Sequence, residues 1–154
     1  MLKPTKILVP VDFSEFSAKA VQYGSEFAKT FDAELILGHV LEIPTYPMGM
    51  GMEAAAPMYI SADVTPVVEE RLDKLMKEHV AKGVKVRRWV RESTTPFLEI
   101  IQMAKDEDVD LIIMPTHGRT GLSHLIIGST AERVVRQAPC PVLVVRQHEK
   151  DIVA

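Results

Sequence analysis

Five short runs rich in apolar residues alternate with stretches of helical periodicity, and this alternation limits the possible folds more than any other feature. The runs are KILVPV (6–11), AELILGHV (33–40), VKVRRWV (84–90), DLIIMPT (110–116) and PVLVVR (141–146). Several are almost continuously apolar, which is typical of parallel strands covered on both faces. The sequence therefore predicts an α/β fold, a single open doubly wound sheet of five mainly parallel strands with four helices and right-handed crossovers.

Four helical stretches connect these runs. The first follows Ser14, a residue suited to cap a helix, and the third starts at Pro96, where a missing N–H costs nothing. The fourth begins near Ser129. Apolar positions recur every three or four residues, which predicts the buried faces Phe16, Ala20, Tyr23, Phe27 and Phe31; Val68, Leu72, Leu75 and His79; Leu98, Ile101 and Ala104 or Lys105; and Val134, Val135 and Ala138.

Composition and charge exclude several classes of protein. The 154 residues, 47% of them hydrophobic, fit one domain, 1–154, without room for a second. The formal net charge is −3 and the cationic residues are scattered, so we expect neither nucleic acid nor a membrane as partner. No stretch has the form of a secretory leader or approaches about 20 apolar residues. With Cys140 as the only cysteine, we expect a cytoplasmic protein without disulfides.

One long segment, at about 44–63, has the composition of an irregular loop. It holds three prolines, two glycines and four of the eight methionines, and it follows the carboxyl end of the second predicted strand. We therefore predict a flexible loop on the ligand side of the sheet. It could act as a lid over a bound molecule or be a plain surface loop. The stretch MGMGM also spaces three thioethers in the manner of a Cu(I) site.

Common catalytic and nucleotide-binding motifs are missing. The first strand turns into its helix through VPVDFSEFS, which contains no glycine, so the dinucleotide fingerprint G-x-G-x-x-G is absent from its required place. No P-loop and no G-x-S-x-G elbow occurs, and the five histidines show no paired metal-ligand spacing. The sequence thus predicts no catalytic residue and no metal ligand.

The stretch MPTHGRTGLSHLIIGST, residues 114–130, carries features that favour a phosphate group. A glycine-containing turn follows the fourth strand, and Gly128, Ser129 and Thr130 open the fourth helix. A helix start presents unpaired N–H groups and a partial positive charge, and glycine lets oxygen atoms reach the main chain. A purely structural interpretation remains open, because Ser129 and Glu132 have the spacing of a capping box.

Nearly the whole chain resembles the universal stress protein family. The resemblance rests on KILVPVDFS, on HV at the end of the second strand, and on THGRTGLSHLIIGSTAERVVRQAPCPVLVV. It implies a Rossmann-like fold of the adenine nucleotide alpha hydrolase kind and a homodimer that pairs through the last strand, here Val142, Leu143, Val144 and Val145. A subgroup of the family binds ATP or AMP, with or without Mg²⁺ or Mn²⁺, through the pattern G-x2-G-x9-G-[ST].

This pattern fits the chain with one departure. If Gly118 is the second glycine, nine residues separate it from Gly128-Ser129, and the first glycine is replaced by Pro115. Proline has no N–H to donate and fixes φ near about −65°, so any contact that the family makes through this nitrogen is lost.

The resemblance also implies which residues form the site. Asp12 would accept a hydrogen bond from the ribose or the adenine, although an aspartate in this position also suits a helix start. Val40 would offer its main chain to the base, and Gly118 and Arg119 would flank the phosphates. The full set is Pro10, Val11, Asp12, Val40, Pro115, Thr116, Gly118, Arg119, Gly128, Ser129 and Thr130.

The sequence therefore favours an adenine nucleotide-binding stress-response or regulatory protein that acts as a dimer. A slow ATP hydrolase or phosphotransferase is an alternative, with His117 and Asp12 as its only plausible proton handlers and no base and metal-ligand set of the usual kind. A family member that lost its nucleotide site and acts through protein contacts is the third possibility, because Pro115 permits it.

Overall fold

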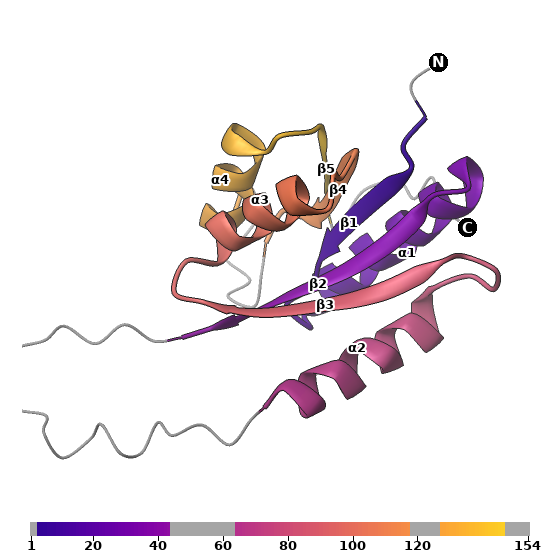
Figure 1. The fold of residues 1–154 in the computed structure, drawn as a ribbon, viewed down its shortest axis with the longest axis horizontal. Coiled ribbons are helices and arrows are strands. Elements are labelled where there is room, and N and C mark those ends of the chain that lie inside the picture. Colours follow the sequence, from indigo (N-terminus) through magenta and orange to yellow (C-terminus); the bar gives the residue numbers. More distant parts are fainter. Residues whose placement is uncertain (1–2, 44–63, 118–126, 147–154) are drawn as a thin grey trace, which may run out of the picture.

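Five parallel strands form one sheet in the order β3-β2-β1-β4-β5 (Figure 1). The structure is a computed structural model, and it describes residues 3–43, 64–117 and 127–146. The strands are β1 (Lys6–Pro10), β2 (Glu34–Glu42), β3 (Val86–Ser93), β4 (Leu111–Pro115) and β5 (Val142–Val145). All five predicted strands are confirmed, and all of them run parallel.

In the described part of the chain, four helices cover the two faces of this sheet. They are α1 (Glu15–Phe31), α2 (Thr65–His79), α3 (Pro96–Asp106) and α4 (Ser129–Gln137). In Figure 1, α1 and α2 lie on one face of the sheet and α3 and α4 on the other. Side chains of β1 alternate between these faces, so that Ile7 and Val9 belong to the apolar cluster with α1 and α2, and Leu8 belongs to the cluster with α3 and α4. The doubly wound α/β architecture is therefore confirmed.

Some predictions lie outside the described residues. The loop at 44–63 is one of them, and with it the lid, surface-loop and Cu(I) interpretations. Gly118 and Arg119 are the others. Within the described ranges, no helix is long and apolar enough to cross a membrane.

The predicted faces of the first two helices agree with the structure. The Ser14 hydroxyl accepts a hydrogen bond from the Ser17 amide, 3.2 Å away, and so caps α1 as expected. Ala20 and Tyr23 are buried in α1, and Val68 and Leu72 are buried in α2.

Two residues predicted to face the core are exposed instead. Leu98 on α3 is 50% exposed and Val135 on α4 is 46% exposed. Each lies about 100° around the helix from a residue that packs inward, because an α-helix turns by that angle at every residue. The buried stripes are Ile100, Ile101, Met103 and Ala104 on α3, and Ala131 and Val134 on α4.

The Asp110 carboxylate links two strands at the amino-terminal end of the sheet through hydrogen bonds. Its Oδ2 accepts hydrogen bonds from the Thr5 amide (2.7 Å), the Thr5 hydroxyl (2.8 Å) and the Lys6 amide (3.0 Å). These bonds, led by that from the Thr5 backbone, lower the pKa of the Asp110 carboxyl. These hydrogen bonds join the residues at the start of β1 to the residue just before β4, at the amino-terminal end of both strands.

Candidate functional site

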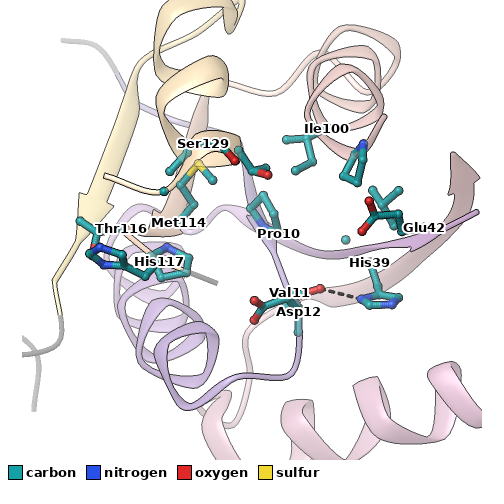
Figure 2. A pocket seen from close by; sticks show the side chains of 17 residues that line it. Pro10, Val11, Asp12, His39, Glu42, Ile100, Met114, Thr116, His117 and Ser129 are labelled. Carbon is teal, nitrogen blue, oxygen red and sulfur yellow. Dashed lines mark hydrogen bonds between the residues drawn. The ribbon is translucent and has the colours of Figure 1, made fainter. Parts of the chain in front are cut away.

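A cleft of about 370 Å³ lies at the carboxyl ends of β1, β2 and β4, between the starts of α3 and α4. Figure 2 shows Ser129 of α4 on one side of this cleft and Asp12 and His39 on the opposite side. In the sheet, β2 and β3 lie on one side of β1, and β4 and β5 lie on the other side. The order in which the chain adds strands therefore changes direction between β1 and β4, and the cleft lies at that switch point. Ligands of open α/β sheets bind at such switch points.

Two prolines border the opening between β1 and β4. The ladder between these strands ends at the pair Leu8 and Ile112. The Val11 amide bonds to β2 and the Thr116 amide bonds to β5. Because alternate residues of a strand bond the same neighbour, the nitrogens of Pro10 and Pro115 face the gap between β1 and β4. Neither nitrogen carries a hydrogen, so neither proline can continue the ladder between the two strands.

The turn from β1 into α1 places Asp12 at the cleft. Asp12 Oδ1 accepts hydrogen bonds from the Ser14 amide (3.0 Å) and the Ser14 hydroxyl (2.5 Å). Asp12 therefore supports the helix start, as predicted, but it uses only one of its two carboxylate oxygens for this. Oδ2 has no hydrogen-bond partner within the described part of the chain, so it can accept a bond from a ligand.

His39, from the end of β2, supports the same turn. Its Nδ1 lies 2.7 Å from the Val11 carbonyl oxygen, and because a carbonyl only accepts, Nδ1 is the donor. The imidazole is buried and packs against the Phe13 ring, with ring centroids 4.6 Å apart. Both residues therefore hold the backbone that leads to Asp12.

The amino-terminal end of α4 forms the opposite wall. The Gly128 amide donates to the Thr116 carbonyl (2.7 Å), and the Gly128 carbonyl accepts from the Glu132 amide (2.9 Å). The amides of Ser129, Thr130 and Ala131 precede this first bond of the helix, so they are the donors left for an anion.

The capping-box interpretation of Ser129 and Glu132 is wrong. Gly128 is the N-cap residue, and no side chain caps the helix. The Glu132 carboxylate instead accepts a hydrogen bond from Arg136 one turn later, at 3.1 Å. Ser129 therefore opens α4 without satisfying the helix by its own side chain.

Gly128 is also required by close packing. A Cβ at this position would lie 3.1 Å from the Thr116 carbonyl oxygen and 3.6 Å from the His117 Cα. Its φ of −59° is ordinary, so the lack of a side chain matters here and backbone freedom does not. The glycine lets the tip of α4 approach the end of β4.

His117 continues the chain beyond β4 and lines the cleft. Its Nδ1 lies 2.9 Å from the Thr116 hydroxyl oxygen, and its Nε2 is buried with no partner among the described residues. Asp12 and Glu42 are the acidic groups of the lining. No group of three or more His, Cys, Asp or Glu side chains in the described ranges is arranged to hold a metal ion.

Nine of the eleven predicted site residues line this one cleft. They are Pro10, Val11, Asp12, Val40, Pro115, Thr116, Gly128, Ser129 and Thr130. Gly118 and Arg119 lie outside the described residues. The structure thus brings together segments from β1, β2, β4 and α4 that are far apart in the sequence.

Eight lining residues were not among those eleven, although His117 was already named as a proton handler for the alternative hydrolase. They are Gly38, His39, Glu42, Pro96, Ile100, Met114, His117 and Ala131. Most of them could have been predicted from their place in the chain, because they lie at the carboxyl end of a strand or in the first turn of the helix that follows, where ligands of open α/β sheets bind. Pro96 was assigned only to a helix start and Ile100 to no site, since nothing in the sequence indicates that α3 leans over the cleft.

Fold and site together define a Rossmann-like α/β domain with a ligand cleft at its switch point. The model of the universal stress protein family matches residues 4–146. Universal stress protein MJ0531 of Methanocaldococcus jannaschii is 36% identical over 146 residues, which cover 95% of this chain and 84% of the relative.

Solved structures share this fold. The structure of MJ0577, another universal stress protein of that organism, matches with a TM-score of 0.76 and 30% identity, covering 97% of this chain and 100% of the other. A universal stress protein family protein of Arabidopsis thaliana with AMP bound has a TM-score of 0.60 at 23% identity, covering 94% and 93%. This chain belongs to the universal stress protein family, as its motifs indicated.

Proposed function

We propose that this chain is an adenine nucleotide-binding regulatory protein of the stress response. The observation that carries the proposal is the cleft itself (Figure 2), which combines the amides at the tip of α4, without a partner among the described residues, with the Asp12 carboxylate on the opposite wall. A phosphate needs N–H donors and a partial positive charge, and a nucleoside needs an acceptor for its hydroxyl or amino groups. The solved relative that contains AMP supports the same ligand class.

The nucleotide would lie across the carboxyl ends of β1 and β2. Asp12 Oδ2 would accept from the ribose or the adenine, and the main chain of Val40 would bond the edge of the base. The phosphates would lie at Ser129 and Thr130, with Gly118 and Arg119 contributing as the family pattern implies. Mg²⁺ or Mn²⁺, where it takes part, would be held mainly by the phosphates, as is usual for nucleotide-bound Mg²⁺.

Binding without turnover is the activity that this site supports best. Of the two plausible proton handlers, Asp12 has one oxygen committed to Ser14, and His117 has its Nδ1 committed to Thr116. We therefore propose a ligand-dependent regulator with at most weak ATPase activity. The nucleotide would stabilise one conformation of the cleft or of the dimer.

The dimer would form through β5. The two edges of the sheet differ, because β3 carries three arginines and a glutamate whereas β5 consists of Val142, Leu143, Val144 and Val145. Charged side chains on an edge strand discourage pairing with another chain, and an apolar edge invites it. A second copy of this chain is thus the natural partner for β5.

Calorimetric titration tests the nucleotide proposal. AMP and ATP, each with and without Mg²⁺, should bind wild-type protein with measurable heat at millimolar ligand or below. Gly128→Val should abolish this heat, because its side chain would collide with the Thr116 carbonyl at the phosphate end. Val135→Ala, an exposed position on the same helix, should bind as wild type does. Wild-type protein that gives no heat with either nucleotide would contradict the proposal.

A further inference from the structure

The turn between β1 and α1 contains no glycine, yet one of its residues has a left-handed backbone. Phe13 has a φ of 63°, a conformation that bulky side chains rarely adopt. Strained residues of this kind persist where the surrounding structure holds them, and they gather at functional sites. Phe13 stands directly between Asp12, which lines the cleft, and Ser14, which caps α1.

Contacts from two other elements hold the Phe13 ring. The buried imidazole of His39, from β2, contacts the ring, with ring centroids 4.6 Å apart. The guanidinium carbon of Arg71, from α2, lies 3.9 Å from the centroid of the Phe13 ring. The ring is thus in contact with a buried imidazole and with a cation, and each of these contacts stabilises its position.

The backbone before Phe13 is held as firmly as its ring. The Val11 amide donates to the Gly38 carbonyl, and the Val11 carbonyl accepts from His39 Nδ1; the donor–acceptor distance is 2.7 Å in both hydrogen bonds. The Asp12 side chain is fixed through Ser14, as described above. A change in the backbone angles of Phe13 would therefore be transmitted to Asp12, because the residues on either side of this turn are anchored.

We propose that Phe13 is a positioning residue, whose ring, held by its contacts with His39 and Arg71, keeps the turn left-handed and so holds the Asp12 carboxylate at the ligand. This inference rests on the proposed nucleotide-binding function and deepens it. Arg71 extends the arrangement to α2, which otherwise lies outside the cleft. Phe13 itself does not line the cleft, so it acts through Asp12.

A double-mutant cycle with AMP as the ligand tests this role. Phe13→Gly permits the same φ without strain but removes the ring, so the turn gains freedom and Asp12 loses its fixed orientation. We expect AMP affinity to fall about tenfold, the size of one lost charge-assisted hydrogen bond. In an Asp12→Asn background the same change should cost less than about twofold, because the group that Phe13 orients is already altered.

Three further variants serve as controls. In a Ser129→Ala background Phe13→Gly should again cost about tenfold, since Ser129 lies on the other wall and does not couple with Phe13. Phe13→Tyr keeps the ring and should bind AMP within about twofold of wild type. Arg71→Gln, at an exposed position of α2, keeps the fold and should weaken AMP binding about threefold, again only where Asp12 is intact.

The possible results separate this inference from the proposed function. Wild-type protein that binds no AMP contradicts the proposed function, and the positioning role with it. Wild-type protein that binds AMP while Phe13→Gly weakens binding equally with and without the Asp12→Asn change overturns the positioning role alone. Non-additivity confined to the pairs of Phe13 or Arg71 with Asp12 supports it. Thermal unfolding of each variant confirms that folded protein is being compared.

Discussion

Pro10 on β1 and Pro115 on β4 direct their nitrogens into the same gap, and the ladder between the two strands stops at that point. Proline within a central strand ordinarily removes a ladder hydrogen bond. Here both losses fall on the same pair of strands, beyond the pair Leu8 and Ile112. The two imino acids therefore leave the end of this ladder, where it borders the cleft, without an N–H donor.

Pro115→Gly should strengthen nucleotide binding. The change adds an N–H that faces the gap, where it can bond a ligand oxygen, and one charge-assisted bond corresponds to about a tenfold gain in affinity. The added backbone freedom should lower stability by about 1 kcal/mol. Titration with AMP and urea unfolding measure the two effects.

Pro141→Gly provides the matched control for this variant. It makes the same backbone change just before β5, at an exposed residue that does not line the cleft. It should lower stability without changing affinity. An affinity for AMP that stays the same or falls in Pro115→Gly would show that this nitrogen does not face the ligand.

The fold was predictable because its signals are local. Continuous apolar runs mark strands covered on both faces, and Ser14 marks the start of α1, so a parallel sheet with its ligand edge follows from short stretches of sequence. The sequence was a poorer guide to which side of each helix faces the sheet. Leu98 and Val135 are apolar and lie near the correct period, but only tertiary packing decides which flank of a helix faces the sheet.

The position of the candidate cleft was predictable from the sequence, whereas the hydrogen bonds around it were not. The sequence could not show that the Gly128 amide bonds the Thr116 carbonyl, because that bond joins segments separated by the 118–126 stretch. Nor did it indicate a left-handed residue after Asp12, since positive φ is ordinarily marked by glycine and here the residue is Phe13. Both features depend on contacts between distant elements.

Asp110→Asn should destabilise the protein at neutral pH but much less in acid. Folding lowers the pKa of this carboxyl, so its contribution is present above the pKa of the unfolded chain and is lost as the pH falls through the folded value. Because the side chain is exposed, we expect a difference in unfolding free energy of about 1 kcal/mol at pH 7. Below the unfolded pKa of about 4 the difference should begin to shrink, and it should be lost once the pH has fallen through the lower folded pKa and the wild-type carboxyl has become neutral.

Urea unfolding at pH 7 and pH 3 measures this difference. Thr5→Val removes the hydroxyl donor and keeps both amide donors, so it should show a smaller loss in the same direction. A wild-type advantage that is equal at both pH values would rule out the carboxylate as its source.

Val144→Pro should produce a folded monomer. The Ile112 amide bonds the Pro141 carbonyl and the Thr116 amide bonds the Val145 carbonyl. Alternate residues of a strand bond the same neighbour, so the Val144 amide points away from β4, toward the open edge of β5. Proline there removes an N–H needed only for pairing with a second copy.

Sedimentation velocity at micromolar concentration distinguishes the two states. Wild-type protein should sediment as a dimer and Val144→Pro as a monomer of similar thermal stability. Val144→Thr, which keeps both the N–H and the β-branched shape, should remain dimeric. If Val144→Pro still dimerises, the contact between copies does not use the β5 edge.

Gly24→Ala tests how closely α1 packs on the strands that carry the cleft. Alanine is the better helix former by about 1 kcal/mol, which alone would stabilise the protein. The added Cβ, however, would lie 2.6 Å from Val9 Cγ2 and 3.0 Å from Leu35 Cδ1. Overpacking of a tight core costs about 1–3 kcal/mol, so packing should outweigh propensity and unfolding should require less urea.

In a Val9→Ala background the obstructing methyl group is gone, and the same change should cost at least about 1 kcal/mol less. A Gly24→Ala variant more stable than wild type would mean that α1 can move off the sheet freely.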